Sequence, residues 1–158
     1  MHVTLRVVEG LPSLRSRRVW PVVRRVLRAA AARFRQMFRI VEYSVQSNHL
    51  HLVVEATDRR ELSRGMQGFG IRLAKNLNLR LERRGSVLQD RYHAHTLRNP
   101  SETLRALRYV RQNEHLHRFR KGERTSNPDP CSTDVPAARA ALPPPKSYFL
   151  RAACSAFS

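Results

Sequence analysis

The stretch Asn48-His49-Leu50-His51 contains two histidines whose spacing suits metal binding. It opens an apolar segment, residues 49–55, that is typical of a β-strand. Side chains two residues apart on a strand share a face, so His49 and His51 would project together while Leu50 enters the core. Because imidazole is a common metal ligand, the pattern predicts part of a metal site with a third ligand from elsewhere. The competing interpretation is a histidine pair on a solvated strand face.

A second pair, His93 and His95, has the same spacing and also lies in a stretch that looks extended. Its middle residue, Ala94, is small, and its surroundings are more polar. Spacing alone does not decide which pair would bind a metal. The second pair could instead contact a phosphate or pack against the first.

Tyr109 is a candidate nucleophile in the helical stretch 107–113. A phenol with a pKa of about 10 reacts poorly unless a charge or a metal assists it. Asn113 follows four residues later, on the same helical face, so its amide oxygen could join a metal that polarises a phosphate. The alternatives are an ordinary helix tyrosine with a buried ring and an asparagine that faces solvent. Tyr92 is another available tyrosine.

The elements that must position these residues follow from hydrophobic periodicity. Strands are expected over residues 2–8, 39–45 and 49–55, with a short extended stretch within 92–97, and helices over 17–38, 60–84 and 100–115. The turn at Ser47-Asn48 predicts that the second and third strands pair as a hairpin. This order indicates an α+β fold, a ferredoxin-like antiparallel sheet with helices on one face. The chain begins inside its first strand, which suggests a truncated N-terminus.

The sequence divides into a domain over residues 1–120 and a Pro/Ala-rich segment over residues 121–158. Most of the prolines lie in this second segment, and its hydrophobic periodicity is lost. Such composition predicts a largely disordered tail. Cys131 and Cys154 have neither the spacing of metal ligands nor that of a disulfide framework.

The net charge of +18 indicates a nucleic-acid partner, and all but three of the 30 basic residues are arginine. The alternative explanation of the charge is an arginine bias that comes from a GC-rich genome. A basic face on the helix at 60–84 and arginines near the proposed chemistry are the candidate phosphate contacts, namely Arg72, Lys75, Arg91, Arg98 and Arg108. No apolar run reaches the roughly 20 residues of a membrane span, and no signal peptide is present, so the cytoplasm is the expected location.

Three blocks of the sequence, residues 45–55, 89–99 and 107–113, together resemble the HUH single-tyrosine transposases of insertion sequences. The resemblance is closest to the REP-associated tyrosine transposases and covers roughly residues 2–117. It implies an HUH endonuclease-type fold. It also aligns His95 with a family histidine outside the metal pair.

The resemblance implies that His49, His51 and Asn113 bind Mg²⁺ or Mn²⁺. Tyr109 would attack single-stranded DNA and form a 5′-phosphotyrosine with a free 3′-hydroxyl, and rejoining would transfer the strand without ATP. The substrates would be DNA hairpins near the ends of a mobile element. The chain departs from the family where Glu114 replaces the proline that commonly follows the asparagine. The resemblance therefore does not predict where this helix ends.

Two other functions fit the sequence. One is a catalytically decayed or domesticated module that binds DNA or RNA hairpins without cleaving them. The other is a different HUH nuclease, such as a replication initiator or relaxase, which the compact one-domain build disfavours. Both a homodimer and a monomer are compatible with the sequence, and no membrane partner is expected.

Overall fold

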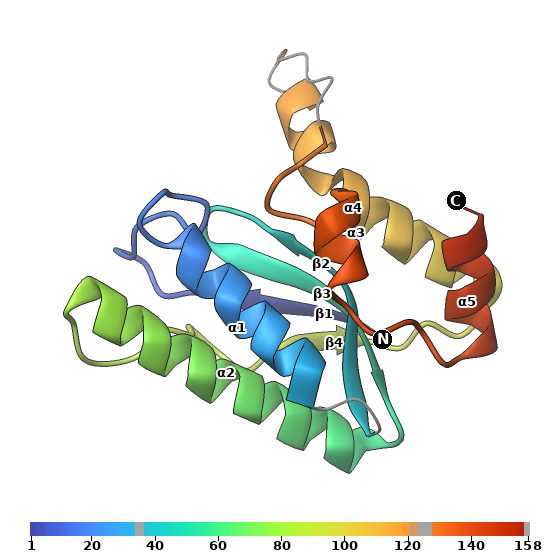
Figure 1. Cartoon of the computed structure of the whole chain (residues 1–158), viewed down its shortest axis with the longest axis horizontal. Coiled ribbons are helices and arrows are strands. Elements are labelled where there is room, and N and C mark those ends of the chain that lie inside the picture. The colour runs from blue at the N-terminus through green and yellow to red at the C-terminus, as the bar shows by residue number, and fades with distance from the viewer. Residues whose placement is uncertain (34–36, 121, 123–127, 157–158) are drawn as a thin grey trace.

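The computed structural model describes residues 1–33, 37–120, 122 and 128–156 (Figure 1). Its elements follow the order expected from periodicity as far as the third long helix, and two short helices come after it. They are β1 (His2–Arg6), α1 (Trp20–Arg33), β2 (Phe38–Val45), β3 (His49–Ala56), α2 (Arg59–Leu81), β4 (His93–His95), α3 (Pro100–Arg120), α4 (Pro136–Ala140) and α5 (Tyr148–Ser155).

The four strands form one antiparallel sheet in the order β2-β3-β1-β4. This order and the two helices that connect the strands confirm the ferredoxin-like α+β fold, and β2 and β3 pair as the expected hairpin. Leu5 of β1 faces Leu50 of β3, and Thr4 faces His51. On the other side of β1, His2 faces His95 of β4. The register therefore places several polar side chains in a row across one face of the sheet.

The first face of the sheet packs against α1 and α2, which lie side by side in Figure 1. Alternate strand residues such as Leu5, Leu50 and Leu52 are buried in this core. On α2 the buried residues recur at helical spacing: Leu62, Gly65, Met66, Phe69, Gly70, Leu73 and Leu77. Gly65 is required by close packing, because a Cβ there would lie 2.3 Å from Cγ of Phe38.

The opposite face of the sheet packs against α3 and α5. Here Val41 and Val53 meet Leu107 and Val110 of α3, together with Leu150 of α5. The expectation that the helices lie on one face of the sheet therefore holds for α1 and α2 only. The helices α3 and α5 cover part of the other face. The central strand β3 contributes apolar residues to both faces, as a strand covered on both sides does.

The ends of the helices have identifiable caps. Asp58 accepts a hydrogen bond from the backbone of Glu61 at the start of α2. That helix ends at Leu81, three residues before the expected end, because Glu82 adopts a left-handed backbone with φ of 52°. At the start of α3, the side chain of Asn99 accepts a hydrogen bond from the backbone N–H of Glu102, and the carboxylate of Glu102 accepts one from the backbone N–H of Arg98.

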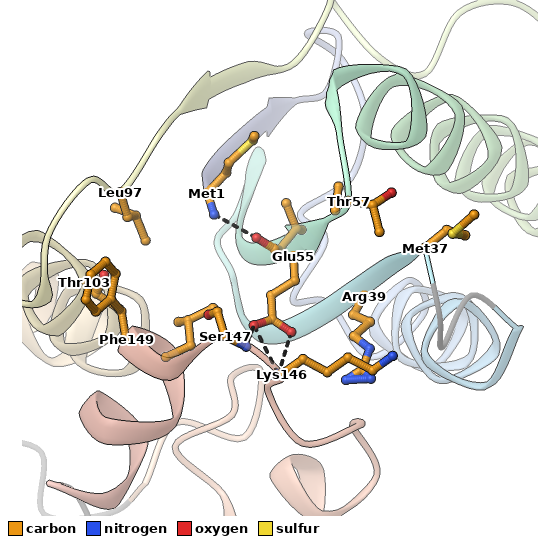
Figure 2. A pocket seen from close by; sticks show the side chains of 13 residues that line it. Met1, Met37, Arg39, Glu55, Thr57, Leu97, Thr103, Lys146, Ser147 and Phe149 are labelled. Carbon is orange, nitrogen blue, oxygen red and sulfur yellow. Dashed lines mark hydrogen bonds between the residues drawn. The ribbon is translucent and has the colours of Figure 1, made fainter.

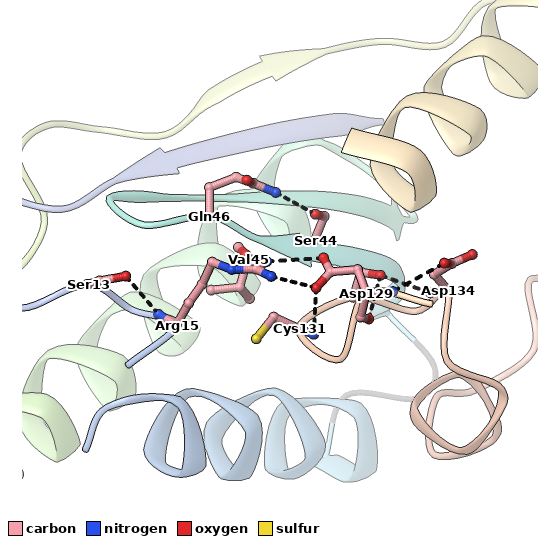
Figure 3. A network of polar contacts seen from close by, with 9 residues as sticks. Ser13, Arg15, Ser44, Val45, Gln46, Asp129, Cys131 and Asp134 are labelled. Carbon is pink, nitrogen blue, oxygen red and sulfur yellow. Dashed lines mark hydrogen bonds and ion pairs between the residues drawn. The ribbon is translucent and has the colours of Figure 1, made fainter. Parts of the chain in front are cut away.

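Residues 128–156 differ from the expected disordered tail, because they contain α4, α5 and a segment that lies along the outer edge of β2. The backbone N–H of Val45 donates to the carbonyl of Cys131, at 2.9 Å. Buried Asp129 forms two hydrogen-bonded contacts with Arg15, at 2.7 and 3.1 Å (Figure 3). These anchors are individual polar contacts between distant residues, so composition and periodicity could not predict them.

The start of α5 is anchored at the far end of β3 from the histidine pair (Figure 2). The carboxylate of Glu55 accepts hydrogen bonds from the backbone N–H groups of Lys146 and Ser147, at 2.7–3.1 Å. A cavity of about 300 Å³ lies beside this contact. Among the helices in the described part of the chain, none has the length and apolar character needed to cross a membrane.

Candidate nuclease site

The two histidines of β3 project from the same face of the sheet, as the strand alternation predicted, and Tyr109 of α3 lies over that face. Leu50 between them is fully buried in the core under α1 and α2. His51 is buried and His49 is half-buried. The hairpin turn places His49 at the first position of β3.

The two imidazoles converge through their Nε2 atoms, which lie 3.1 Å apart. The Oδ1 atom of Asn48 lies 2.8 Å from Nδ1 of His49 and can accept a hydrogen bond from an N–H at that position. A neutral imidazole with its proton on Nδ1 has a lone pair on Nε2. Two nitrogen ligands at right angles on a small octahedral cation lie about 3 Å apart. The separation and direction of the two Nε2 atoms therefore fit a divalent cation.

Tyr109 of α3 also approaches the Nε2 atom of His51. Its hydroxyl lies 3.4 Å from Nε2 of His51, and the two rings meet edge to face with centroids 5.0 Å apart. The tyrosine is 40% exposed, so its hydroxyl can be approached from solvent. The structure thus brings together His49, His51 and Tyr109 within a single chain.

Asn113 lies one turn beyond Tyr109 on α3 and is almost completely buried. Its Nδ2 atom has no hydrogen-bond partner in the described part of the chain. A buried amide without a partner costs free energy, and such groups need an explanation. Among the described residues no group of three or more His, Cys, Asp or Glu side chains could hold a metal.

His2 and Thr4 of β1 are also part of the site, and sequence reasoning missed them. His2 Nε2 and Thr4 Oγ1 each lie 3.2 Å from Nδ1 of His51. Desolvation by burial, followed by the N-terminal ammonium and His95, lowers the pKa of His2. The alternation of His2 and Thr4 with Val3 and Leu5 was a visible signal. The β1–β3 register that directs them to His51 was not.

The rival residues do not join this cluster. His93 and His95 pair with Thr4 and His2 across β1 and β4, so they lie beside the site. His93 and His95 are exposed on the short strand β4, and His95 approaches Glu102 at 3.9 Å. Tyr92 packs against the core under α1 and α2, which is the face of the sheet opposite to His51. The geometry therefore favours His49 and His51 over the second pair, and Tyr109 over Tyr92.

The five predicted phosphate contacts are spread over three parts of the fold. Arg72 is half-buried and Lys75 is exposed, both on α2. Arg91 and Arg98 are exposed in the loops that flank β4, and Arg108 is exposed on α3 next to the tyrosine. Arg108 and Arg98 are the members of this set that belong to α3 or to the turn before it.

Comparison with known proteins assigns the family. The family model described as "Transposase IS200 like" matches residues 9–113, which is more than half of the chain. The chain belongs to the IS200-like transposase family. The matched region of this transposase-family chain contains β2, β3, α2 and the part of α3 that carries Tyr109.

A solved structure has the same fold. It is described as a REP-associated tyrosine transposase bound to a REP hairpin, and it superposes with a TM-score of 0.61 at 18% sequence identity. The match covers 90% of this chain and 81% of that chain. No match was found among curated proteins. At this identity the structural likeness supports the fold, while the family assignment rests on the family model.

Proposed function

We propose that the chain is a DNA transposase that cleaves single-stranded hairpin DNA and transfers the cut strand through a covalent bond to Tyr109. One observation carries the proposal. The Tyr109 hydroxyl lies 3.4 Å from the Nε2 atom of His51, and that nitrogen faces Nε2 of His49 at 3.1 Å. Membership of the IS200-like transposase family supports the same conclusion.

In this proposal His49, His51 and Asn113 hold Mg²⁺ or Mn²⁺. The two converging nitrogens of His49 and His51 fit that role, and Asn113 would contribute its Oδ1 atom, since an amide nitrogen only donates hydrogen bonds. When bound, the cation would polarise a phosphate oxygen and stabilise the negative charge that develops during attack. The protein groups would set the position of the phosphate relative to the tyrosine.

The reaction exchanges one phosphodiester for another. The Tyr109 oxygen forms a bond to the phosphorus, the bond from phosphorus to the 3′ oxygen breaks, the phenol loses its proton and the leaving oxygen gains one. The products are a 5′-phosphotyrosine and a free 3′-hydroxyl. Attack by a 3′-hydroxyl on the phosphotyrosine reverses these bond changes and joins the strands. Because the bond energy is kept in the protein–DNA link, no nucleotide cofactor is required.

The proposed DNA partner follows from charge. A net charge of +18 on 158 residues attracts phosphates over a wide surface, and arginine pairs well with phosphate oxygens. The structural neighbour is described as bound to a hairpin. We propose that Arg72, Lys75, Arg91, Arg98 and Arg108 contact the DNA backbone and position it without specifying its sequence.

The test is to incubate the protein with labelled single-stranded hairpin DNA and Mn²⁺ and to measure an adduct that survives denaturing electrophoresis. The native chain should form the adduct, and both Tyr109→Phe and a chelator should abolish it. Tyr92→Phe is the matched control, because Tyr92 packs on the other face of the sheet. It should leave adduct formation within about twofold of native, since phenylalanine keeps the ring that packs there and the change lies away from the site.

Binding without an adduct on a broad panel of hairpins would contradict the enzyme and would favour a hairpin-binding module. An adduct that persists in Tyr109→Phe but disappears in Tyr92→Phe would move the nucleophile to Tyr92.

A further inference from the structure

We propose that Thr4 and His2 of β1 accept a hydrogen bond from the Nδ1–H group of His51 and thereby keep its Nε2 atom unprotonated and directed at His49. They would be positioning residues for the metal site, because neither is placed to contact the cation itself. The inference rests on the proposed function for the role of the metal. The position of the proton on His51 can be measured without metal or DNA.

The geometry gives His51 Nδ1 two possible acceptors. Thr4 Oγ1 and His2 Nε2 each lie 3.2 Å from it. The ring of His2 stacks on that of His51 with centroids 5.2 Å apart and an angle of 29°. The same His2 ring meets Tyr109 edge to face at 5.8 Å. His2 therefore packs against both the inner histidine and the proposed nucleophile.

The need for an acceptor follows from imidazole chemistry. A neutral imidazole carries one N–H, and the nitrogen without the proton is the one that binds a metal. Because Nε2 of His51 faces His49, the proton must sit on Nδ1 for a cation to bind between them. Asn48 has the equivalent position beside His49 Nδ1, at 2.8 Å. With Thr4 and His2, both ligands would then have an acceptor behind them, as metal-binding histidines usually do.

The sheet register makes this arrangement rigid. Thr4 lies directly opposite His51 in the β1–β3 pair, and His2 is two residues away on the same face. His51 is buried, so water does not readily replace these acceptors. A purely structural role, in which His2 and Thr4 only fill space, predicts that removing their acceptor atoms leaves the proton position on His51 unchanged.

The experiment uses pairs of variants that differ in hydrogen-bonding ability. Thr4→Val and His2→Phe remove the acceptors, while Thr4→Ser keeps a hydroxyl and His2→Gln replaces the ring nitrogen with an amide oxygen that can also accept. His93→Gln is the control, because His93 lies opposite Thr4 on β4 but is exposed. Two readouts are needed: the protonated nitrogen of His51 from long-range ¹H–¹⁵N NMR spectra without metal, and the Mn²⁺ dissociation constant. A C-terminal tag leaves the Met1 ammonium free to donate to the carbonyl of Val54, at 2.7 Å.

We expect the native spectrum to show the proton on Nδ1 of His51. The Thr4→Val/His2→Phe double variant should shift it toward Nε2 and weaken Mn²⁺ binding by about 10- to 100-fold. Thr4→Ser, His2→Gln and the control should remain within about threefold of native, since surface and conservative changes have small effects. Circular dichroism and thermal melting identify any variant that is unfolded, and the single variants replace it.

Native His51 protonated on Nε2 would overturn the inference, and so would an unchanged proton position in a folded double variant. These outcomes do not depend on metal. A native chain that binds no Mn²⁺ while keeping its proton on Nδ1 would instead count against the proposed metal chemistry and leave the tautomer assignment supported.

Discussion

Asn113 combines almost complete burial with an amide nitrogen that has no hydrogen-bond partner in the described structure. A buried polar group in that state costs roughly 1–3 kcal/mol of stability. An apolar side chain of similar size would avoid the cost. The amide lies one turn from Tyr109, and its oxygen atom, not this nitrogen, is the atom that would serve as a metal ligand.

The corresponding prediction compares Asn113→Leu with Asn113→Asp. Asn113→Leu should keep or raise the thermal midpoint of the metal-free protein, because it removes the orphan amide, but should weaken Mn²⁺ binding at least about 10-fold by removing a ligand oxygen. Asn113→Asp keeps an oxygen and should retain measurable Mn²⁺ binding. Thermal melting and titration calorimetry provide the two measurements. Native-like Mn²⁺ affinity in Asn113→Leu would exclude this residue as a ligand.

At the residue scale, sequence reasoning could predict that His49 and His51 share a face, because strand alternation is a local property. It could not find His2 and Thr4, because their meeting with His51 depends on which strand pairs with β3 and in which register. Local patterns therefore predict side-chain direction well. They predict contacts between distant strands only when a fold is already assumed.

A buried ion pair fixes α3 to the sheet. Its member on α3 lies in sequence between the proposed nucleophile and the proposed third ligand. Arg111 of α3 donates to the carboxylate of Glu42 on β2, and both side chains are almost fully buried. Arg139 of α4 approaches the same carboxylate at 3.8 Å. This pair holds the helix against the sheet while Tyr109, two residues earlier, faces His51.

Removal of one partner should be strongly destabilising. We expect Arg111→Met to lower the free energy of unfolding by about 3–5 kcal/mol, because it leaves the Glu42 carboxylate buried and without its nearest cation. The Glu42→Leu/Arg111→Met double variant should recover a large part of that loss, since two apolar side chains leave no buried charge behind. Urea denaturation of both variants measures the difference. Equal stability of Arg111→Met and the native chain would show that the pair does not hold α3.

At the element scale, hydrophobic periodicity predicted the type and order of seven elements, and the boundaries differed by up to five residues. The first helix was expected to reach Phe38, but α1 ends at Arg33 and Phe38 begins β2. The early end of α2 at Leu81 depends on one left-handed residue, Glu82, which is not a residue type that marks such an end. Periodicity also did not reveal that α3 covers the face of the sheet opposite to α1 and α2. A helix pattern shows that a side is buried, but not which surface it is buried against.

Across the whole molecule, the site is assembled from one chain. Tyr109 lies 3.4 Å from His51 of the same protein, so no second copy is needed to bring the nucleophile to the histidine pair. Exchange of α3 between two copies would require breaking the buried contacts of Leu107, Val110 and Arg111 with the sheet.

A mixing experiment tests this arrangement. Tyr109→Phe and His51→Ala should each fail to form the hairpin adduct, and an equimolar mixture of the two should also fail, because neither molecule holds a complete site. Adduct formation is measured by denaturing electrophoresis, with native protein diluted into each variant as the control for recovery. An adduct in the mixture would show that the tyrosine of one copy acts beside the histidines of another.

The contact between Arg15 and Asp129 has a consequence for how the protein is made. The two partners are 114 residues apart in sequence, and Asp129 lies in the segment that covers the outer edge of β2. Ribosomes synthesise chains from the N-terminus, so α1, the sheet and Tyr109 all emerge before this clamp exists. A nascent chain can thus form its histidine pair while the outer edge of β2 is still uncovered. That edge is covered only after the proline-rich segment has been synthesised. Frameshifts or stop codons late in the gene would therefore leave the chemistry encoded but the sheet edge exposed to pairing with other chains.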